Sequence, residues 1–123
     1  MVIYERVQNA LSEEDAMEKL VKRLQATRAE EAEWSHSLGR DHGLSWAMDD
    51  ASYGDLVEWS NADVVRSNFI DGVPFPDTAE AQEWAQSAQE MARDEQQYFD
   101  HDAYARGFLE AAAEVWEKVR GKL

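Results

Sequence analysis

The sequence contains no cysteine. This absence excludes a disulfide framework and any metal site built on thiolates, zinc fingers among them. Long apolar stretches are missing too, since the first residues, MVIYERVQNAL, already include an arginine and a glutamate. We therefore expect no signal peptide, no membrane-spanning helix and a cytoplasmic location.

Basic residues are scarce. The chain has 12 Lys and Arg against 26 Asp and Glu, which gives a formal net charge of −14. Residues 41–102 contain 15 acidic residues and, as bases, only Arg66 and Arg93, so this middle segment carries −13. Such a segment repels phosphate backbones and attracts basic surfaces. We therefore expect a basic protein as partner, and no direct binding to nucleic acid or membrane.

Recognisable catalytic motifs are missing as well. The sequence has no Gly-x-Ser-x-Gly and no glycine-rich phosphate loop. Asp41 and His42 are sequence neighbours, and neighbours diverge by about 100° on a helix, which is a poor geometry for a base and its orienting carboxylate. The run at 100–102, Asp-His-Asp, better fits a helix boundary. We predict that the protein is not an enzyme and needs no cofactor.

Helix signals dominate what is present. The length of 123 residues fits one domain with one core, residues 1–123. Ser12 is followed by acidic residues and a helically spaced apolar set, so we predict a helix from about Glu13 to about Met48, either unbroken or with a break in the thirties. A short strand at residues 2–4 is the only competing pattern.

Three further capping sites predict the later helices. Ser52 precedes a short helix, and Asp77 or Thr78 precedes a helix whose apolar face extends to Phe99. The run Asp-His-Asp at 100–102 restarts the helical pattern, whose apolar set is periodic from Tyr104 to Val119. The fold class we predict is all-α, a single-domain bundle of about four to five helices.

Residues 67–77 contain both prolines of the chain and an Asp-Gly pair, so we predict a connection rather than a helix. The connection is unusually apolar for a loop. Two interpretations stay open: its apolar side chains fill the core, or they form a hydrophobic recognition loop. These side chains are Phe69, Ile70, Val73 and Phe75.

Glycines inside the first long helix predict close packing. Each glycine in a helix interior costs about 1 kcal/mol relative to alanine, and close approach of another helix is the usual compensation. We predict a helix-packing seam against the helix that carries Phe108, or against a second copy of the chain, which would make a homodimer. The alternative is that the glycines end the helix at Gly39. The seam comprises His36, Gly39, Gly43 and Ala47.

The histidines of the same segment suggest a metal site as a weaker alternative. His36 and His42 point about 120° apart on a continuous helix, so one helix cannot direct both at one ion. Glu33 and His36 form a Glu-x-x-His, the pair that carboxylate-bridged di-iron bundles use, but such sites need a second pair and further glutamates. Only a dimer could supply them.

The carboxylates of the middle segment form the predicted partner-binding face. Those on the helix after Thr78 fall within an arc of about 80°, away from its apolar side. Solvation alone could explain such a row, but its density favours a basic partner that neutralises it. The acidic face comprises Asp49, Asp50, Asp55, Glu58, Glu80, Glu83, Glu90 and Asp94. As exposed apolar anchors we predict Trp59, Phe69 and Phe75.

In size, charge, lack of cysteine and lack of catalytic motifs, the chain resembles small acidic proteins that inhibit nucleic-acid enzymes. These include phage anti-CRISPR and anti-restriction proteins, DNA mimics and immunity proteins against nuclease toxins. The resemblance implies a non-enzymatic inhibitor from a phage or mobile element that occupies the Lys/Arg clusters of a nucleic-acid-binding enzyme. The alternatives are a dimeric carboxylate/histidine metal-binding protein and a structural helical accessory subunit.

Overall fold

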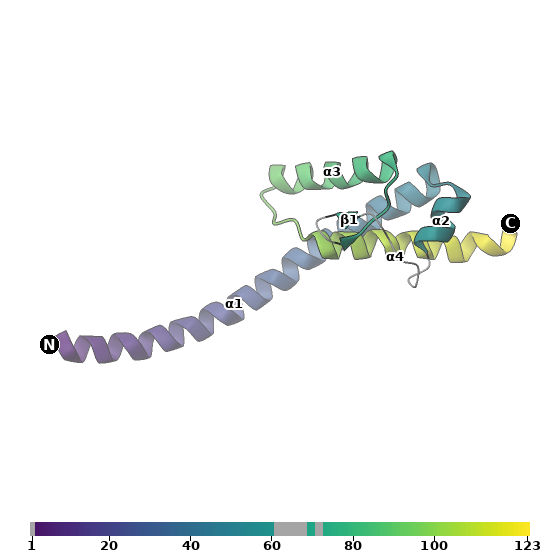
Figure 1. Cartoon of the computed structure of the whole chain (residues 1–123). Coiled ribbons are helices and arrows are strands. Elements are labelled where there is room, and N and C mark those ends of the chain that lie inside the picture. The colour runs from purple at the N-terminus through teal and green to yellow at the C-terminus, as the bar shows by residue number, and fades with distance from the viewer. Residues whose placement is uncertain (1, 61–68, 71–72) are drawn as a thin grey trace. The chain divides into compact units, whose positions relative to one another are not determined.

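The computed structural model describes residues 2–60, 69–70 and 73–123, with side chains described for residues 13–60 and 74–123. The fold is all-α, as the sequence predicts, and the order of elements is shown in Figure 1. Its elements are α1 (Val2–Ser45), η1 (Trp46–Asp50), α2 (Tyr53–Trp59), β1 (Phe69–Ile70), β2 (Val73–Pro74), α3 (Ala79–Asp94), α4 (His101–Val119) and η2 (Arg120–Lys122).

The chain divides into two units, residues 1–30 and residues 31–123, which we describe separately. The first unit is the N-terminal part of α1. The prediction of a helix start near Glu13 and of a strand at residues 2–4 was wrong, because α1 already begins at Val2. Ser12, expected as a cap, lies inside the helix, where serine is only about 0.5 kcal/mol less favourable than alanine.

In the second unit, α1 continues without a break in the thirties, and Gly39 does not end it. The helix passes at Trp46 into η1, a π-helical turn closed by the N–H of Ala51, which donates to the carbonyl oxygen of Trp46 at 2.8 Å. This wider turn buries Trp46 and Ala47 and leaves Met48, Asp49 and Asp50 exposed. The acidic end of the long helix therefore faces solvent.

Gly39 and Gly43 lie where α1 meets α4. A Cβ added to Gly39 would overlap the carbonyl oxygen of Tyr104, and one added to Gly43 would overlap that of Phe108. On the α4 side, a Cβ on Gly107 would overlap the carbonyl oxygen of His36. Backbone thus contacts backbone at three positions, and α4 of the same chain is the helix that meets the predicted seam.

Aromatic rings around α4 form the core of the second unit. Trp46, Phe75, Tyr104 and Phe108 are fully buried, and the ring centre of Phe108 lies 4.6 Å from that of Phe75 and 5.4 Å from that of Trp46. Small side chains cover the helix faces that pack on these rings. The buried alanines are Ala81, Ala85, Ala88 and Ala92 on α3 and Ala103, Ala105, Ala111 and Ala112 on α4.

Side-chain caps begin the three later helices as the sequence predicts. Ser52 and Asp55 form a reciprocal capping box at α2, the hydroxyl of Thr78 accepts the N–H of Ala81 at α3, and Asp100 accepts the N–H of Ala103 at α4. Each cap satisfies backbone donors that a helix start leaves without a partner. Local chemistry therefore determines where these helices begin.

The end of α3 differs from the prediction. The helix ends at Asp94, before Phe99, because Gln96 adopts a left-handed conformation with φ of 57°. The N–H of Gln97 then donates to the carbonyl oxygen of Ala92 at 2.8 Å, which closes the helix end. Neither glycine nor proline marks this turn in the sequence.

Within the predicted connection, β1 (Phe69–Ile70) and β2 (Val73–Pro74) form a small antiparallel pair in which Ile70 faces Val73. The side chains of Phe69, Ile70 and Val73 lie outside the described residues, but that of Phe75 is completely buried. At Phe75, the interpretation that the connection fills the core is the correct one.

Candidate functional site

The carboxylates of α3 form a row on the solvent side of that helix. Glu80, Glu83, Glu90 and Asp94 are all exposed, whereas the four alanines of the opposite face are buried. This orientation follows from the helical period, because apolar positions three and four residues apart turn toward the core and direct the intervening acids outward. The predicted acidic row therefore has the accessibility that a binding surface needs.

A side-chain contact connects η1 to this row. The indole N–H of Trp84 on α3 donates to the carboxylate of Asp50 at 2.9 Å. Trp84 is the next residue after Glu83, which belongs to the row, and Asp49 precedes Asp50 at the exposed end of η1. The structure thus brings the η1 pair and the α3 row, which the sequence separates by about thirty residues, into one neighbourhood.

The α2 carboxylates contribute less to this neighbourhood. Asp55 is half-buried, and its carboxylate accepts the N–H of Ser52 at 3.0 Å as part of the capping box. Its Oδ2 is therefore engaged in the helix cap, while its membership of the acidic face stays a prediction. Glu58 is exposed, and no described residue forms an ion pair with it.

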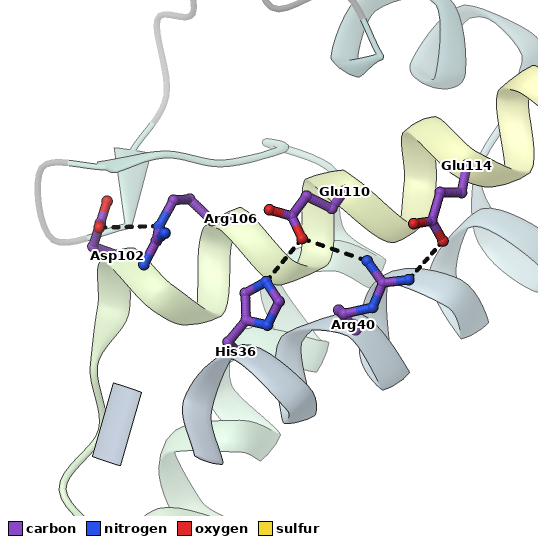
Figure 2. A network of polar contacts seen from close by, with 6 residues as sticks. All are labelled: His36, Arg40, Asp102, Arg106, Glu110 and Glu114. Atoms are coloured by element: carbon purple, nitrogen blue, oxygen red, sulfur yellow. Dashed lines mark hydrogen bonds and ion pairs between the residues drawn. The ribbon is translucent and has the colours of Figure 1, made fainter. Parts of the chain in front are cut away.

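An ion-pair network between α1 and α4 involves carboxylates outside the predicted acidic face. Arg40 contacts Glu114 at 2.6 Å and Glu110 at 3.4 Å, and Glu110 also contacts the Nε2 of His36 at 2.8 Å (Figure 2). The bond to Arg40 lowers the pKa of Glu114, and the same contact raises the pKa of Arg40. This network, which links α1 to α4, was not predicted.

A sequence signal for the network exists. His36 and Arg40 are four residues apart on α1, and Glu110 and Glu114 are four residues apart on α4, so each helix presents a matched pair on one side. Arg106 pairs with Asp102, four residues earlier on α4, at 3.2 Å (Figure 2). Seeing that the two helices face each other, however, required the tertiary structure.

The α3 row, by contrast, has little internal compensation. Arg93 contacts Asp94 at 3.6 Å across two exposed side chains, and Glu90 accepts a hydrogen bond from Gln86 at 3.4 Å. Within the part of the chain that the structure describes, no cation pairs with Glu80 or Glu83. The row is left as a concentrated negative surface.

The predicted apolar anchors are not exposed where the structure describes them. Trp59 is 4% exposed and Phe75 is 0% exposed, so neither can insert into a partner, and the side chain of Phe69 lies outside the described residues. Trp59 and Phe75 were predicted as anchors, and for Phe75 the alternative of a core position was left open. Both rings belong to the hydrophobic core instead, where Phe75 lies against Tyr104 and Phe108 of α4.

The second unit has an exposed apolar groove that the sequence did not predict. Leu44, which is 46% exposed, and Met48, which is 68% exposed, lie on its rim, and Met48 directly precedes Asp49. Its volume of about 440 Å³ falls in the range of small-molecule sites, but the convergent polar groups of such sites are missing, since Lys118 is its one charged lining residue. The lining comprises Leu44, Ala47, Met48, Leu56, Val115, Lys118 and Val119.

His42 is buried and makes a structural contact. Its Nδ1 and the hydroxyl of Tyr104 share a hydrogen bond of 2.8 Å, and its ring centre lies 4.8 Å from that of Trp84. Burial lowers the pKa of His42 and strongly raises the pKa of Tyr104. Asp41, in contrast, faces solvent, so the two neighbours diverge as expected and do not form an acid/base pair.

The alternative metal ligands are not brought together within one chain. Glu33 is exposed, while His36 contacts Glu110. In the described part of the chain, no group of three His, Asp or Glu side chains is placed to hold a metal ion. A single Glu–His contact is too few ligands for a zinc or di-iron site.

The fold is that of an all-α helical bundle, and its second unit carries an exposed carboxylate row on α3 and a separate apolar groove lined by residues of α1, η1, α2 and α4. None of the helices in the described residues is long and apolar enough to cross a membrane. Neither a protein-family model, nor a curated protein, nor a solved structure matched the chain.

Proposed function

We propose that the protein is a non-enzymatic binding protein that docks its carboxylate surface on a basic nucleic-acid-processing protein and inhibits it. Anti-CRISPR, DNA-mimic and nuclease-immunity proteins are inhibitors of this type. The observation that carries the proposal is the row of exposed carboxylates on α3, which no described cation neutralises except Arg93 at its end.

Electrostatics explains why such a surface favours a basic partner. Carboxylates held close together on one helix repel one another and cost stability, and a cationic partner removes that cost. Complementary charge also raises the rate of encounter and selects the class of partner. A surface that binds nucleic acid is where a protein concentrates Lys and Arg, so it is the natural target.

The apolar groove offers a place for apolar contacts, which electrostatic attraction alone does not provide. Affinity concentrates in a few apolar contacts at the centre of an interface, surrounded by polar groups. Met48 at the groove rim is followed by Asp49 and Asp50, so an apolar side chain of the partner flanked by Lys or Arg would satisfy both features.

A matched pair of variants tests this assignment. The first replaces Glu80, Glu83 and Glu90 by glutamine, and the control replaces Glu30, Glu31 and Glu33 by glutamine, so both remove three charges from helical positions. Tagged proteins would be incubated with nuclease-treated lysate of the source cell at low and at high salt. Each captured protein would then be purified and titrated with the inhibitor in competition with nucleic acid.

We expect a basic nucleic-acid-binding protein to be retained at low salt by the wild type and the control, and lost from the α3 variant. The nucleic acid and the inhibitor should compete for binding to this captured protein. If no basic nucleic-acid-binding protein binds at low salt, or if the two variants bind equally well, the proposal is wrong.

A further inference from the structure

The first unit exposes an apolar stripe. Met17, Val21 and Leu24 are 57%, 52% and 52% exposed, and Leu20 is partly exposed beside them. Their spacing of three and four residues places all four on one side of α1. Such a stripe on a solvent-exposed helix is the ordinary signature of a surface that another helix covers.

The stripe is symmetric along the helix. Its midpoint lies between Leu20 and Val21, and Met17 and Leu24 lie at equal distances on either side of that point. A second helix that runs antiparallel about this midpoint therefore presents the same apolar positions in register. A two-fold symmetric contact uses one surface on both partners, so it requires this kind of self-complementarity.

The charges around the stripe reverse sign at the same midpoint. All acidic residues of the segment 13–28 precede it and all but one of the basic residues follow it. The acids are Glu13, Glu14, Asp15 and Glu18, and the bases are Lys19, Lys22, Arg23 and Arg28. An antiparallel pair places the acidic end of each helix against the basic end of the other, whereas a parallel pair places like charges together.

We propose that residues 13–28 form a self-association site, in which the occupant of the apolar stripe is the same segment of a second copy in antiparallel orientation. Glu13 then lies opposite the partner's Arg28, and Glu18 lies beside the partner's Lys22. In the described residues none of these four side chains forms an ion pair within its own chain. Lys19, the base that precedes the midpoint, pairs internally with Asp15 at 3.3 Å.

A shallow hollow lies on the flank of the stripe. Met17, Glu18, Val21, Lys22 and Gln25 line it, so Met17 and Val21 belong to both features. The site is independent of the α3 surface, so it can fail or succeed separately from the proposed function.

Engineered cysteines test both association and orientation, because the natural chain has none. Met17→Cys and Leu24→Cys chains of the full-length protein would be oxidised separately and as a mixture, with Ala26→Cys, on the opposite side of the helix, as control. We expect disulfide-linked dimers in the Met17→Cys plus Leu24→Cys mixture and not in either alone. Efficient cross-linking of Met17→Cys with itself indicates a parallel pair and overturns the proposal.

A charge exchange provides the second test, read by sedimentation equilibrium at low salt with helicity checked by circular dichroism. Arg28→Glu should weaken the dimer by about tenfold, because like charges then meet at both ends. Adding Glu13→Arg should restore it, since the pairs are re-formed with reversed sign. A wild type that stays monomeric at all concentrations, or a double variant that is no tighter than Arg28→Glu, overturns the proposal and leaves the stripe to another occupant.

Discussion

Trp84 donates its indole N–H to the carboxylate of Asp50 across 2.9 Å. This bond joins α3 to η1, and the same ring lies against His42 with a centre-to-centre distance of 4.8 Å. One side of Trp84 thus belongs to the buried interior and its polar edge to the acidic surface. The contact therefore positions the carboxylates of η1 beside those of α3.

Replacing Trp84 by phenylalanine should lower the free energy of unfolding by about 0.5–1.5 kcal/mol beyond the effect of the smaller ring, because Asp50 loses its donor. Trp116→Phe is the matched control, since Trp116 is also half-buried and packs edge-on against Tyr53 at 5.6 Å. Urea unfolding followed by circular dichroism measures both. Equal losses in the two variants would show that the hydrogen bond contributes nothing.

Gly43→Ala should destabilise the protein by about 1–3 kcal/mol or more, because the new methyl group overlaps the backbone of Phe108, which cannot move without shifting α4. Gly54→Ala serves as the control. Its Cβ would meet nothing closer than the hydroxyl of Ser52 at 3.9 Å, so the helix should gain about 0.5–1 kcal/mol. Thermal unfolding of both variants should shift in opposite directions, and a harmless Gly43→Ala would contradict the close approach of α1 and α4.

The free energy of unfolding should fall as the pH drops below the pKa of an ordinary histidine. Burial lowers the pKa of His42 in the folded state, so the unfolded chain takes up the proton first. The contribution of His42 to the free energy of unfolding is therefore completely present above about pH 6.5. It decreases as the pH falls from there to the folded-state pKa. Urea unfolding between about pH 7.5 and 5.5 should show this decrease in the wild type and in His36→Gln. It should be reduced in His42→Gln, and an unchanged slope there would refute the assignment.

Moderate salt should stabilise the protein. The middle segment carries a large negative excess, and about 0.15 M salt screens the repulsion between exposed charges more than roughly 8 Å apart. The urea midpoint should therefore rise between low and physiological sodium chloride. The Glu80, Glu83 and Glu90→Gln variant should show a smaller rise. If salt lowers the midpoint instead, attraction outweighs repulsion in the folded state.

Much of the fold was predictable because its determinants are local. Ser52 was recognised as a cap, Asp77 or Thr78 as the next one, and the run at 100–102 as a helix boundary; in the structure Ser52, Thr78 and Asp100 are the caps. The exposed acidic row of α3 followed from helical periodicity in the same way. The early end of α3 was missed, because Gln96 has no sequence signature for a left-handed conformation.

The surface of the candidate site was harder to predict. Trp59 and Phe75 were expected as exposed anchors but are buried, and the groove beside Met48 was not foreseen. Exposure of an aromatic ring depends on which other segment covers it, and neither propensity nor spacing reports that. The pairing of Arg40 with Glu110 and Glu114 was missed for the same reason.

By itself, the sequence determined the helical class, the capping residues, the small-residue strip around Gly39 and Gly43, and the acidic excess of residues 41–102. These depend on backbone hydrogen bonds and side-chain period within a few residues. The tertiary structure alone decided that α4 meets the strip, that Phe75 is buried, and that Asp50 reaches Trp84. Those outcomes depend on how distant segments share one core, because burial is a property of the neighbours that pack around a residue.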